Sequence, residues 1–268
     1  MKIADSVRER YSRGAQVREP ELCCPVDYDP KLLAQLPTEI VEKDYGCGDP
    51  SRYVRAGDTV LDLGSGSGKV CYLTAQLVGP AGRVIGVDIN DDMLALARRY
   101  QDEMARKLGG DRVRFVKGYI QDLALDAEAL DRYLAQSPVR DAAGLAALEA
   151  WRTEQRSQRP LIADASVDVV ISNCVLNLVA ESDRRQMIRE IHRVLKPGGK
   201  LMIVDYHRPA PLHPLRLLLH QVLVWLEPFA LDIWRNEVIS WFPADFQPKE
   251  IKKETLFGGM YQIISIQR

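Results

Sequence analysis

A glycine-rich segment, DLGSGSG at residues 62–68, has the residue types of a cofactor-binding loop. It joins an apolar run at residues 59–63, typical of a buried strand, to residues 69–78, whose pattern is typical of a helix. Glycines at such a junction let the backbone approach a ligand where any Cβ atom would clash. The next predicted strand, residues 83–88, ends at Asp88, a position from which a carboxylate can bind ribose hydroxyls. These features predict a nucleotide-like cofactor at the carboxyl ends of two neighbouring strands.

The details of the loop favour one cofactor chemistry over another. A dinucleotide fingerprint has glycines at its first, third and sixth positions. Counted from Gly64, the sixth position is Lys69, and the third glycine comes one residue early, at Gly68. Asp62 lies just upstream, where its carboxylate would repel a pyrophosphate but attract a cofactor that carries an ammonium and a sulfonium. The loop therefore predicts S-adenosylmethionine rather than a nicotinamide dinucleotide.

The elements around this loop predict one large α/β domain. The chain has 268 residues, of which 46% are hydrophobic, and a formal net charge of −1. This balance excludes a basic nucleic-acid-binding surface and a disordered acidic tail, so no nucleic-acid partner is predicted. Strand and helix signals alternate from residue 58 onward, with later strands predicted at 113–116, 167–172 and 200–205. Such alternation indicates a parallel sheet with helices on both faces.

Two segments fall outside this alternation. Residues 1–57 are polar with helical patches and are predicted to form an N-terminal cap on a domain at residues 58–268. Residues 126–160, between the third and fourth strands, are rich in Ala, Leu, Glu and Arg, which predicts a helical insertion. The insertion is either a surface decoration or a lid, because the crevices of such folds open at the carboxyl ends of strands.

An apolar stretch near the end of the chain, residues 211–231, is interrupted by charged residues and prolines. The interruptions favour a buried helix over a transmembrane span. A lid over an apolar substrate, or peripheral contact with a membrane surface or a partner, are the alternatives. Residues 1–5 lack the apolar core of a secretion signal, so a cytoplasmic location is expected.

Two motifs together resemble those of the class I S-adenosylmethionine-dependent methyltransferases. DLGSGSG resembles their motif I, and LKPGG at residues 195–199 resembles the segment before their fifth strand. The resemblance implies a Rossmann-like seven-stranded sheet with a reversed last strand and helices on both faces, the helical insertion lying between strands 3 and 4. It places the methionine end of the cofactor at the glycine loop, the ribose at Asp88 and the adenine near Ile120. The residues predicted to bind the cofactor are Asp62, Gly64, Ser65, Gly66, Gly68, Asp88, Ile89, Ile120, Gln121 and Asn173.

The cysteines suggest the acceptor of the methyl group. None forms a Cys-x-x-Cys pair, so no zinc site is predicted, and in a cytoplasmic protein structural disulfides are not expected. Cys174 follows the fourth predicted strand at the edge where a substrate is expected, whereas Cys71 is expected to pack inside the fold. Thiolates gathered near a methyl donor favour a soft, thiophilic acceptor. The five cysteines are Cys23, Cys24, Cys47, Cys71 and Cys174.

Three further segments resemble those of arsenite methyltransferases: YGCG at 45–48, GYI at 118–120 and SNCVLNL at 172–178. The resemblance covers roughly residues 23–205. It implies that As(III) is a substrate, not a resident metal, and that glutathione or another thiol takes part. The implied acceptor residues are Cys174, Cys47 and either Cys24 or Cys23. The chain departs from that family in three ways, because it has no cysteine beyond Cys174, carries the helical insertion and has a different tail from His207 onward.

Two other functions are compatible with these residues. A methyltransferase of an apolar small molecule, such as a quinone or a polyketide, is favoured by the tail. A non-catalytic metalloid-binding protein would keep the cofactor fold without turnover. An oxygen or nitrogen acceptor would need a general base, for which Asp205 and His207 are the candidates, although a structural hydrogen bond is the expected role of His207.

Overall fold

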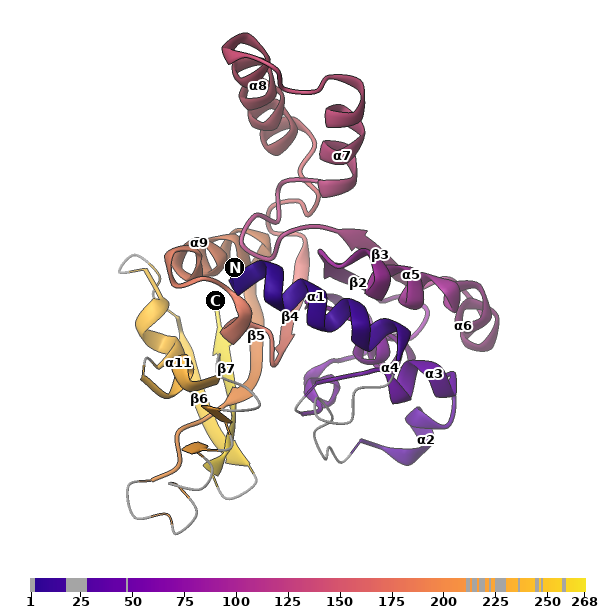
Figure 1. Ribbon diagram of the computed structural model, residues 1–268. Helices are drawn as coiled ribbons and strands as arrows, with labels where there is room; N and C mark the ends of the chain where they lie inside the picture. Colours follow the sequence, from indigo (N-terminus) through magenta and orange to yellow (C-terminus); the bar gives the residue numbers. More distant parts are fainter. Residues whose placement is uncertain are drawn as a thin grey trace.

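The computed structural model describes residues 3–17, 28–46, 48–210, 213, 216, 220–221, 223–224, 230–235, 237–243, 246, 248–256 and 259–268. Within these ranges, one seven-stranded sheet runs through the molecule in the order β3-β2-β1-β4-β5-β7-β6 (Figure 1). Strands β1 to β5 pair in parallel, and β7 is antiparallel to both β5 and β6. The predicted seven-stranded sheet with a reversed last strand is therefore confirmed. The strands are β1 (Thr59–Leu63), β2 (Arg83–Asp88), β3 (Val113–Lys117), β4 (Val167–Asn173), β5 (Leu195–Tyr206), β6 (Glu250–Leu256) and β7 (Tyr261–Gln267).

Helices cover both faces of the sheet, as the sequence predicts (Figure 1). One apolar cluster packs α4 and α5 against one face, and a second packs α9 and α11 against the other. Strand β5 begins at Leu195, earlier than the predicted residue 200, because Leu195 already pairs with Val167 of β4. The helices and 3-10 turns are α1 (Ile3–Gln16), α2 (Pro30–Leu33), α3 (Thr38–Glu42), η2 (Pro50–Tyr53), α4 (Lys69–Val78), α5 (Asp91–Arg99), α6 (Gln101–Leu108), α7 (Ala127–Gln136), α8 (Ala142–Gln158), η3 (Leu176–Leu178), α9 (Glu181–Val194), α11 (Ala230–Arg235) and η4 (Val238–Trp241).

The order of the strands creates a crevice. Strand β1 pairs with β2 on one side and with β4 on the other. The chain therefore adds β2 and β3 on one side of β1 and then reverses direction to add β4 and β5 on the other side. In open α/β sheets, ligands bind at such a reversal, outside the carboxyl ends of the strands. This edge therefore positions the functional site.

The insertion between β3 and β4 is a helical hairpin, α7–α8, that projects away from the sheet (Figure 1). The rings of Tyr133 and Trp151 stack with their centroids 4.7 Å apart and join the two helices. A two-pronged ion pair, Arg156 to Asp122 at 2.7 Å, ties α8 to the loop after β3. The predicted helical insertion is confirmed, and no residue of α8 is buried.

Within the described ranges, none of the helices has both the length and the apolar character needed to cross a membrane. Most of the apolar stretch at 211–231 lies outside the described residues. The division into residues 1–57 and 58–268 stays a prediction.

Candidate functional site

A cavity of about 250 Å³ lies at the carboxyl ends of β1, β2 and β4. All of the predicted cofactor-binding residues except Gly68 line it, and Cys174 lines it as well. The structure thus brings together residues that are more than 100 positions apart in the chain. The lining residues are Tyr11, Lys43, Asp44, Tyr45, Gly46, Asp62, Gly64, Ser65, Gly66, Ser67, Val70, Asp88, Ile89, Asn90, Met93, Gly118, Tyr119, Ile120, Gln121, Asn173, Cys174, Val175, Leu178, Val179, Ala180 and Asp183.

The glycine loop is held against β2 by its own backbone. The backbone N–H of Gly64 donates to the Val87 carbonyl at 2.8 Å, and that of Gly66 donates to Asp88 Oδ2 at 2.9 Å. Gly66 has a φ of +52°, and a Cβ atom built there would meet nothing within 4 Å. The loop therefore leaves open space where a ligand can approach the backbone closely.

Gly68 is the predicted cofactor-binding residue that does not line the cavity. It has a φ of +84° at the start of α4 and does not line the cavity. A Cβ atom at this position would lie 2.6 Å from Phe115 Cζ and 3.2 Å from Ala97 Cβ. The close packing of α4 against its neighbours explains this glycine without a ligand.

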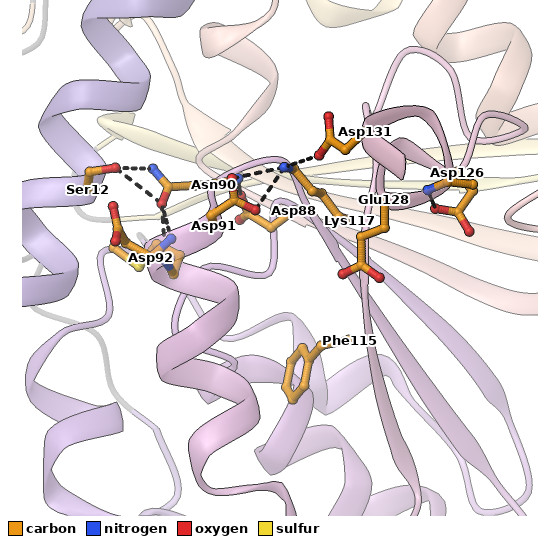
Figure 2. A network of polar contacts seen from close by, with 12 residues as sticks. Ser12, Asp88, Asn90, Asp91, Asp92, Phe115, Lys117, Asp126, Glu128 and Asp131 are labelled. Atoms are coloured by element: carbon orange, nitrogen blue, oxygen red, sulfur yellow. Dashed lines mark hydrogen bonds and ion pairs between the residues drawn. The ribbon is translucent and has the colours of Figure 1, made fainter. Parts of the chain in front are cut away.

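Asp88 organises the loop and the start of α5 (Figure 2). Its Oδ1 accepts a hydrogen bond from the Asn90 backbone at 2.8 Å, while Oδ2 accepts the one from Gly66. The Asn90 side chain caps α5 and donates to Ser12 Oγ of α1 at 3.0 Å. Burial raises the pKa of Asp88, although the backbone donors oppose this shift. Helix α1 is thereby held beside the cavity, to which it contributes Tyr11.

Asp62 is the most deeply placed carboxyl group of the cavity. Its side chain is 3% exposed, and Cys71 Sγ donates a hydrogen bond to its Oδ2 at 3.2 Å. Burial raises the pKa of Asp62 to about 7, and the nearby carboxylates of Asp44 and Asp88 add to the shift. The predicted packing role of Cys71 agrees with its position, since this thiol is fully buried and free.

The charges of the lining favour a cationic ligand. Four carboxyl groups line the cavity, those of Asp44, Asp62, Asp88 and Asp183, against the one lysine among the described lining residues, Lys43. A phosphate-bearing dinucleotide would be repelled here, whereas a cofactor with an ammonium and a sulfonium would be attracted. These residues therefore fit S-adenosylmethionine.

Lys69, which takes the place of the third glycine of a dinucleotide fingerprint, has a structural role. Its Nζ lies 2.5 Å from Asp44 Oδ2 and 4.1 Å from the centroid of the Tyr28 ring. Both side chains of the ion pair are less than a tenth exposed. The pair ties the segment before β1 to α4 and neutralises the lysine at the edge of the loop.

Cys174 lies on the opposite side of the cavity from β2, directly after β4. It is 6% exposed and has a φ of +56°, a left-handed conformation that is uncommon for residues other than glycine and that occurs at functional sites. Its backbone N–H donates to the Val204 carbonyl at 2.8 Å, which holds this conformation.

Cys174 is disulfide-bonded, contrary to the expectation that the chain has no structural disulfides, whereas Cys71 is a free thiol. A disulfide brings a second cysteine sulfur within about 2 Å of the Cys174 sulfur.

Asn173 holds the YGCG segment at the end of β4. Its Oδ1 accepts from the Gly48 backbone N–H at 3.2 Å, and its Nδ2 donates to the Gly48 carbonyl at 2.8 Å. Tyr28 donates to the same carbonyl at 2.8 Å. A Cβ atom at Gly46 would lie 2.4 Å from Asn173 Nδ2, so this approach requires glycine. The described residues on either side of position 47 therefore lie beside Cys174, while Cys47 itself, like Cys23 and Cys24, lies outside the described residues.

The two candidate bases do not line the cavity. Asp205 is fully buried and accepts a hydrogen bond from the Tyr206 backbone at 2.8 Å. His207 Nδ1 lies 2.9 Å from the Gly259 carbonyl, which is the structural hydrogen bond expected for it. Neither residue is placed to take a proton from an acceptor in this cavity.

Several lining residues were missed by the sequence analysis. Tyr11, Asp44 and Tyr45 come from the N-terminal segment, where Tyr45 donates to the Gly14 carbonyl at 3.0 Å and packs edge-on against Tyr11. The YGCG motif, which directly follows Asp44, was a signal that this segment reaches the site. The position of Asp183 at the start of α9 had no comparable signal.

A family model described as a methyltransferase domain matches residues 55–227. The chain belongs to this methyltransferase family. An arsenite methyltransferase of Aquipseudomonas alcaligenes is 38% identical over 210 residues, which are 76% of this chain and 50% of that protein. The human arsenite methyltransferase is 33% identical over 195 residues, 72% of this chain and 42% of that protein. The chain therefore spans half or less of the length of these relatives.

Two further similarities concern the fold and the alternative function. The structure of an arsenic(III) S-adenosylmethionine methyltransferase from Chlamydomonas reinhardtii matches with a TM-score of 0.54 and 27% identity, covering 90% of this chain and 74% of that one. A ubiquinone/menaquinone biosynthesis C-methyltransferase of Klebsiella pneumoniae is 30% identical over 156 residues, 58% of this chain and 45% of that protein. The resemblance to class I methyltransferases, and among them to arsenite methyltransferases, is confirmed.

Proposed function

We propose that this chain binds S-adenosylmethionine and methylates trivalent arsenic held on cysteine thiolates. One observation carries the proposal: Cys174 lines the cavity that also contains Asp62 and Asp88, and its sulfur is bonded to a second cysteine sulfur. Two soft ligands therefore converge next to a site whose charges suit a cationic methyl donor. The similarity to arsenite methyltransferases over about three quarters of the chain supports the same acceptor.

The residues of the cavity have separate roles in this proposal. Asp62 would pair with the ammonium of the cofactor, Asp88 would accept hydrogen bonds from the ribose hydroxyls, and Gln121 would lie at the adenine. When bound, the cofactor supplies a methyl group activated by its sulfonium. The chain's own task is to align the acceptor with that methyl, at about 3–3.5 Å, and to exclude water. No general base is needed for arsenic, since its lone pair attacks, and this agrees with the absence of Asp205 and His207 from the lining.

The disulfide of Cys174 implies a role for an external thiol. A disulfide cannot bind As(III), because the ligand is the thiolate. Two molecules of a thiol such as glutathione would reduce the bond by exchange, leaving two protein thiols and one oxidised thiol pair. We therefore propose thiol-dependent turnover, and the cytoplasmic location stays a prediction.

The test is the release of S-adenosylhomocysteine by the wild type and by Cys174→Ser, with and without arsenite and glutathione. We expect release that requires both additions and falls at least about a hundredfold in Cys174→Ser, because one of the acceptor's ligands is lost. Ser172→Ala is the control, two residues before Cys174 and still within β4, and it should keep the wild-type rate. Cofactor binding measured by calorimetry should survive in both variants. Cofactor binding by the reduced wild type without arsenite-dependent release would contradict the proposal.

A second candidate is methyl transfer to an apolar small molecule. The acceptor side of the cavity includes the apolar side chains of Val175, Leu178 and Val179, and the similarity to a quinone C-methyltransferase supports it. The same assay with a reduced short-chain quinone in place of arsenite distinguishes the two acceptors. Arsenite binding without release from any acceptor would instead favour a non-catalytic metalloid-binding protein.

A further inference from the structure

A second cavity, of about 430 Å³, lies between α11 and the ends of β5 and β7. It shares no lining residue with the cofactor cavity. We propose that this second cavity binds the oxyanion, a carboxylate or a phosphate, of a small molecule, with Arg208, Arg216, Lys253 and the indole N–H of Trp234 as its donors.

The charges of the second cavity are unbalanced. Arg208, Arg216 and Lys253 line it, and Glu237 is the one carboxylate among its described lining residues. Glu237 lies 3.5 Å from Lys253 and its side chain is 70% exposed, so water screens this contact. Within the described part of the chain, neither guanidinium has a carboxylate partner. Two guanidinium groups in one concave site are suited to a planar or tetrahedral oxyanion, because each presents several donors in a fixed fork.

The second observation is an unsatisfied donor. Trp234 is 7% exposed, and its Nε1–H has no acceptor among the described residues. A buried tryptophan N–H usually has a hydrogen-bond partner, and leaving it without one is costly. Trp234 lines the same cavity as the two arginines. One oxyanion bound there can therefore accept a hydrogen bond from the indole N–H and also neutralise positive charge of the arginines.

The position of this cavity relates it to the acceptor side of the first. Strand β5 is the parallel neighbour of β4, so its end at Tyr206 lies at the same edge of the sheet as Cys174. Helix α11 contacts both β5 and η3, the turn that follows Cys174, and it lies beside β6 and β7 (Figure 1). Helix α11 therefore lines this cavity and also contacts the turn that borders the acceptor. The inference does not rest on the proposed function, because binding can be measured without methyl donor or acceptor.

The experiment follows the indole N–H signals of protein labelled with ¹⁵N-tryptophan. The chain has four tryptophans, and Trp234→Phe identifies the signal of Trp234 by its loss. Inorganic phosphate and succinate are added separately at constant ionic strength, with sodium chloride as the reference. We expect a saturable shift of the Trp234 signal with phosphate, succinate or both, while the signal of Trp151 on the distant α8 does not move. The stronger probe distinguishes a phosphate-bearing from a carboxylate-bearing ligand.

The double variant Arg208→Gln/Arg216→Gln should weaken this binding at least tenfold. Arg140→Gln/Arg159→Gln removes the same charge from the exposed insertion and should leave binding unchanged. An unmoved signal of Trp241, which is buried in the core on the α11 side of the sheet, shows in each variant that the fold is intact. Lys253→Gln replaces the double variant if that protein does not fold. The proposal is overturned if Trp234 does not shift saturably, if chloride shifts it equally, or if both double variants bind alike.

Discussion

Two cavities at the carboxyl edge of the sheet, the cofactor cavity and the cavity beside α11, have opposite charge among their described lining residues. The one at β1, β2 and β4 is lined by four carboxyl groups and one lysine, and the one at β5 and β7 by two arginines and a lysine against one carboxylate. They also differ in origin. The central carboxyl groups of the first lie at strand ends within one short stretch of sequence, whereas the second combines residues of β6, β7, α11 and the connecting segments.

This difference shows how one sheet edge can bind groups of opposite charge. Asp62 and Asp88 are at the carboxyl ends of neighbouring parallel strands, so any chain with this strand order would bring them together. Gly48 reaches Asn173, the neighbour of Cys174, only through a contact between distant segments. The arginines of the second cavity likewise meet Lys253 through the tertiary fold. We expect substitutions on the cofactor side to change cofactor affinity, and those on the acceptor side to change turnover at unchanged cofactor affinity.

The largest effect on cofactor affinity is expected from Asp62→Asn. Loss of the buried carboxylate should weaken S-adenosylmethionine binding by about 3 kcal/mol, roughly a hundredfold, measured by calorimetry.

The same substitution should change the stability of the unliganded protein. The pKa of Asp62 is raised to about 7 from 3.8, so the folded state holds this proton, and the free energy of unfolding falls as the pH rises between these values. The unliganded variant should therefore melt at a higher temperature than the wild type at pH 8. Asp183→Asn, which removes a half-buried carboxylate of the same cavity, should lose only about threefold in affinity, because water screens its charge, and should not melt at a higher temperature. Equal losses of affinity in both variants would contradict a special role of Asp62.

Asn173→Ala is expected to separate the two sides. The variant loses both hydrogen bonds to Gly48, which should lower the free energy of unfolding by about 2 kcal/mol. Acceptor-dependent turnover should fall roughly thirtyfold if the same free energy is lost in positioning the YGCG segment. Cofactor affinity should stay within about threefold of wild type, since Asp62 and Asp88 are unchanged. A parallel loss of cofactor affinity would instead assign Asn173 to cofactor binding, as the sequence analysis did.

Cofactor binding should also depend on pH. Between pH 6 and 8 the affinity should rise about tenfold, because a carboxyl group with a pKa near 7 ionises and then attracts the cofactor's positive charge. Asp88, whose pKa is also raised by burial, shifts the affinity in the same direction. Calorimetry in buffers of different ionisation enthalpy should detect proton release on binding below pH 7. In Asp62→Asn the profile should flatten, and an unchanged slope there would refute the assignment.

The smallest effect is expected from Arg156→Ala in the insertion. The ion pair to Asp122 holds the loop that carries Gln121, so its loss should weaken cofactor binding about threefold, a value kept small by the partial exposure of both side chains. Arg159→Ala removes a more exposed arginine of the same hairpin and should leave the affinity unchanged. An effect equal to that of Asp62→Asn would show that the hairpin is part of the cofactor site itself.

The predicted strands and the glycine loop agree with the structure because each depends on local patterns. A buried parallel strand needs a short apolar run, and a close backbone approach needs glycine. The sequence does not separate Gly66, which faces open space in the cavity, from Gly68, which packs against Phe115. Both are glycines with positive φ in one loop, and only the position of α5 and β3 distinguishes their roles.

The sequence by itself determined the order of elements, the anionic cofactor edge and the candidate thiol after β4, because strand ends and loop residues are adjacent in the chain. The tertiary structure decided that Asn173 holds Gly48 across 125 residues, that Lys69 is neutralised by Asp44, and that the cofactor cavity excludes Asp205 and His207. The contacts of Gly48 and Asp44 form only when the N-terminal segment packs over the sheet. Burial then raises the pKa of Asp62, which no pattern of neighbouring residues specifies.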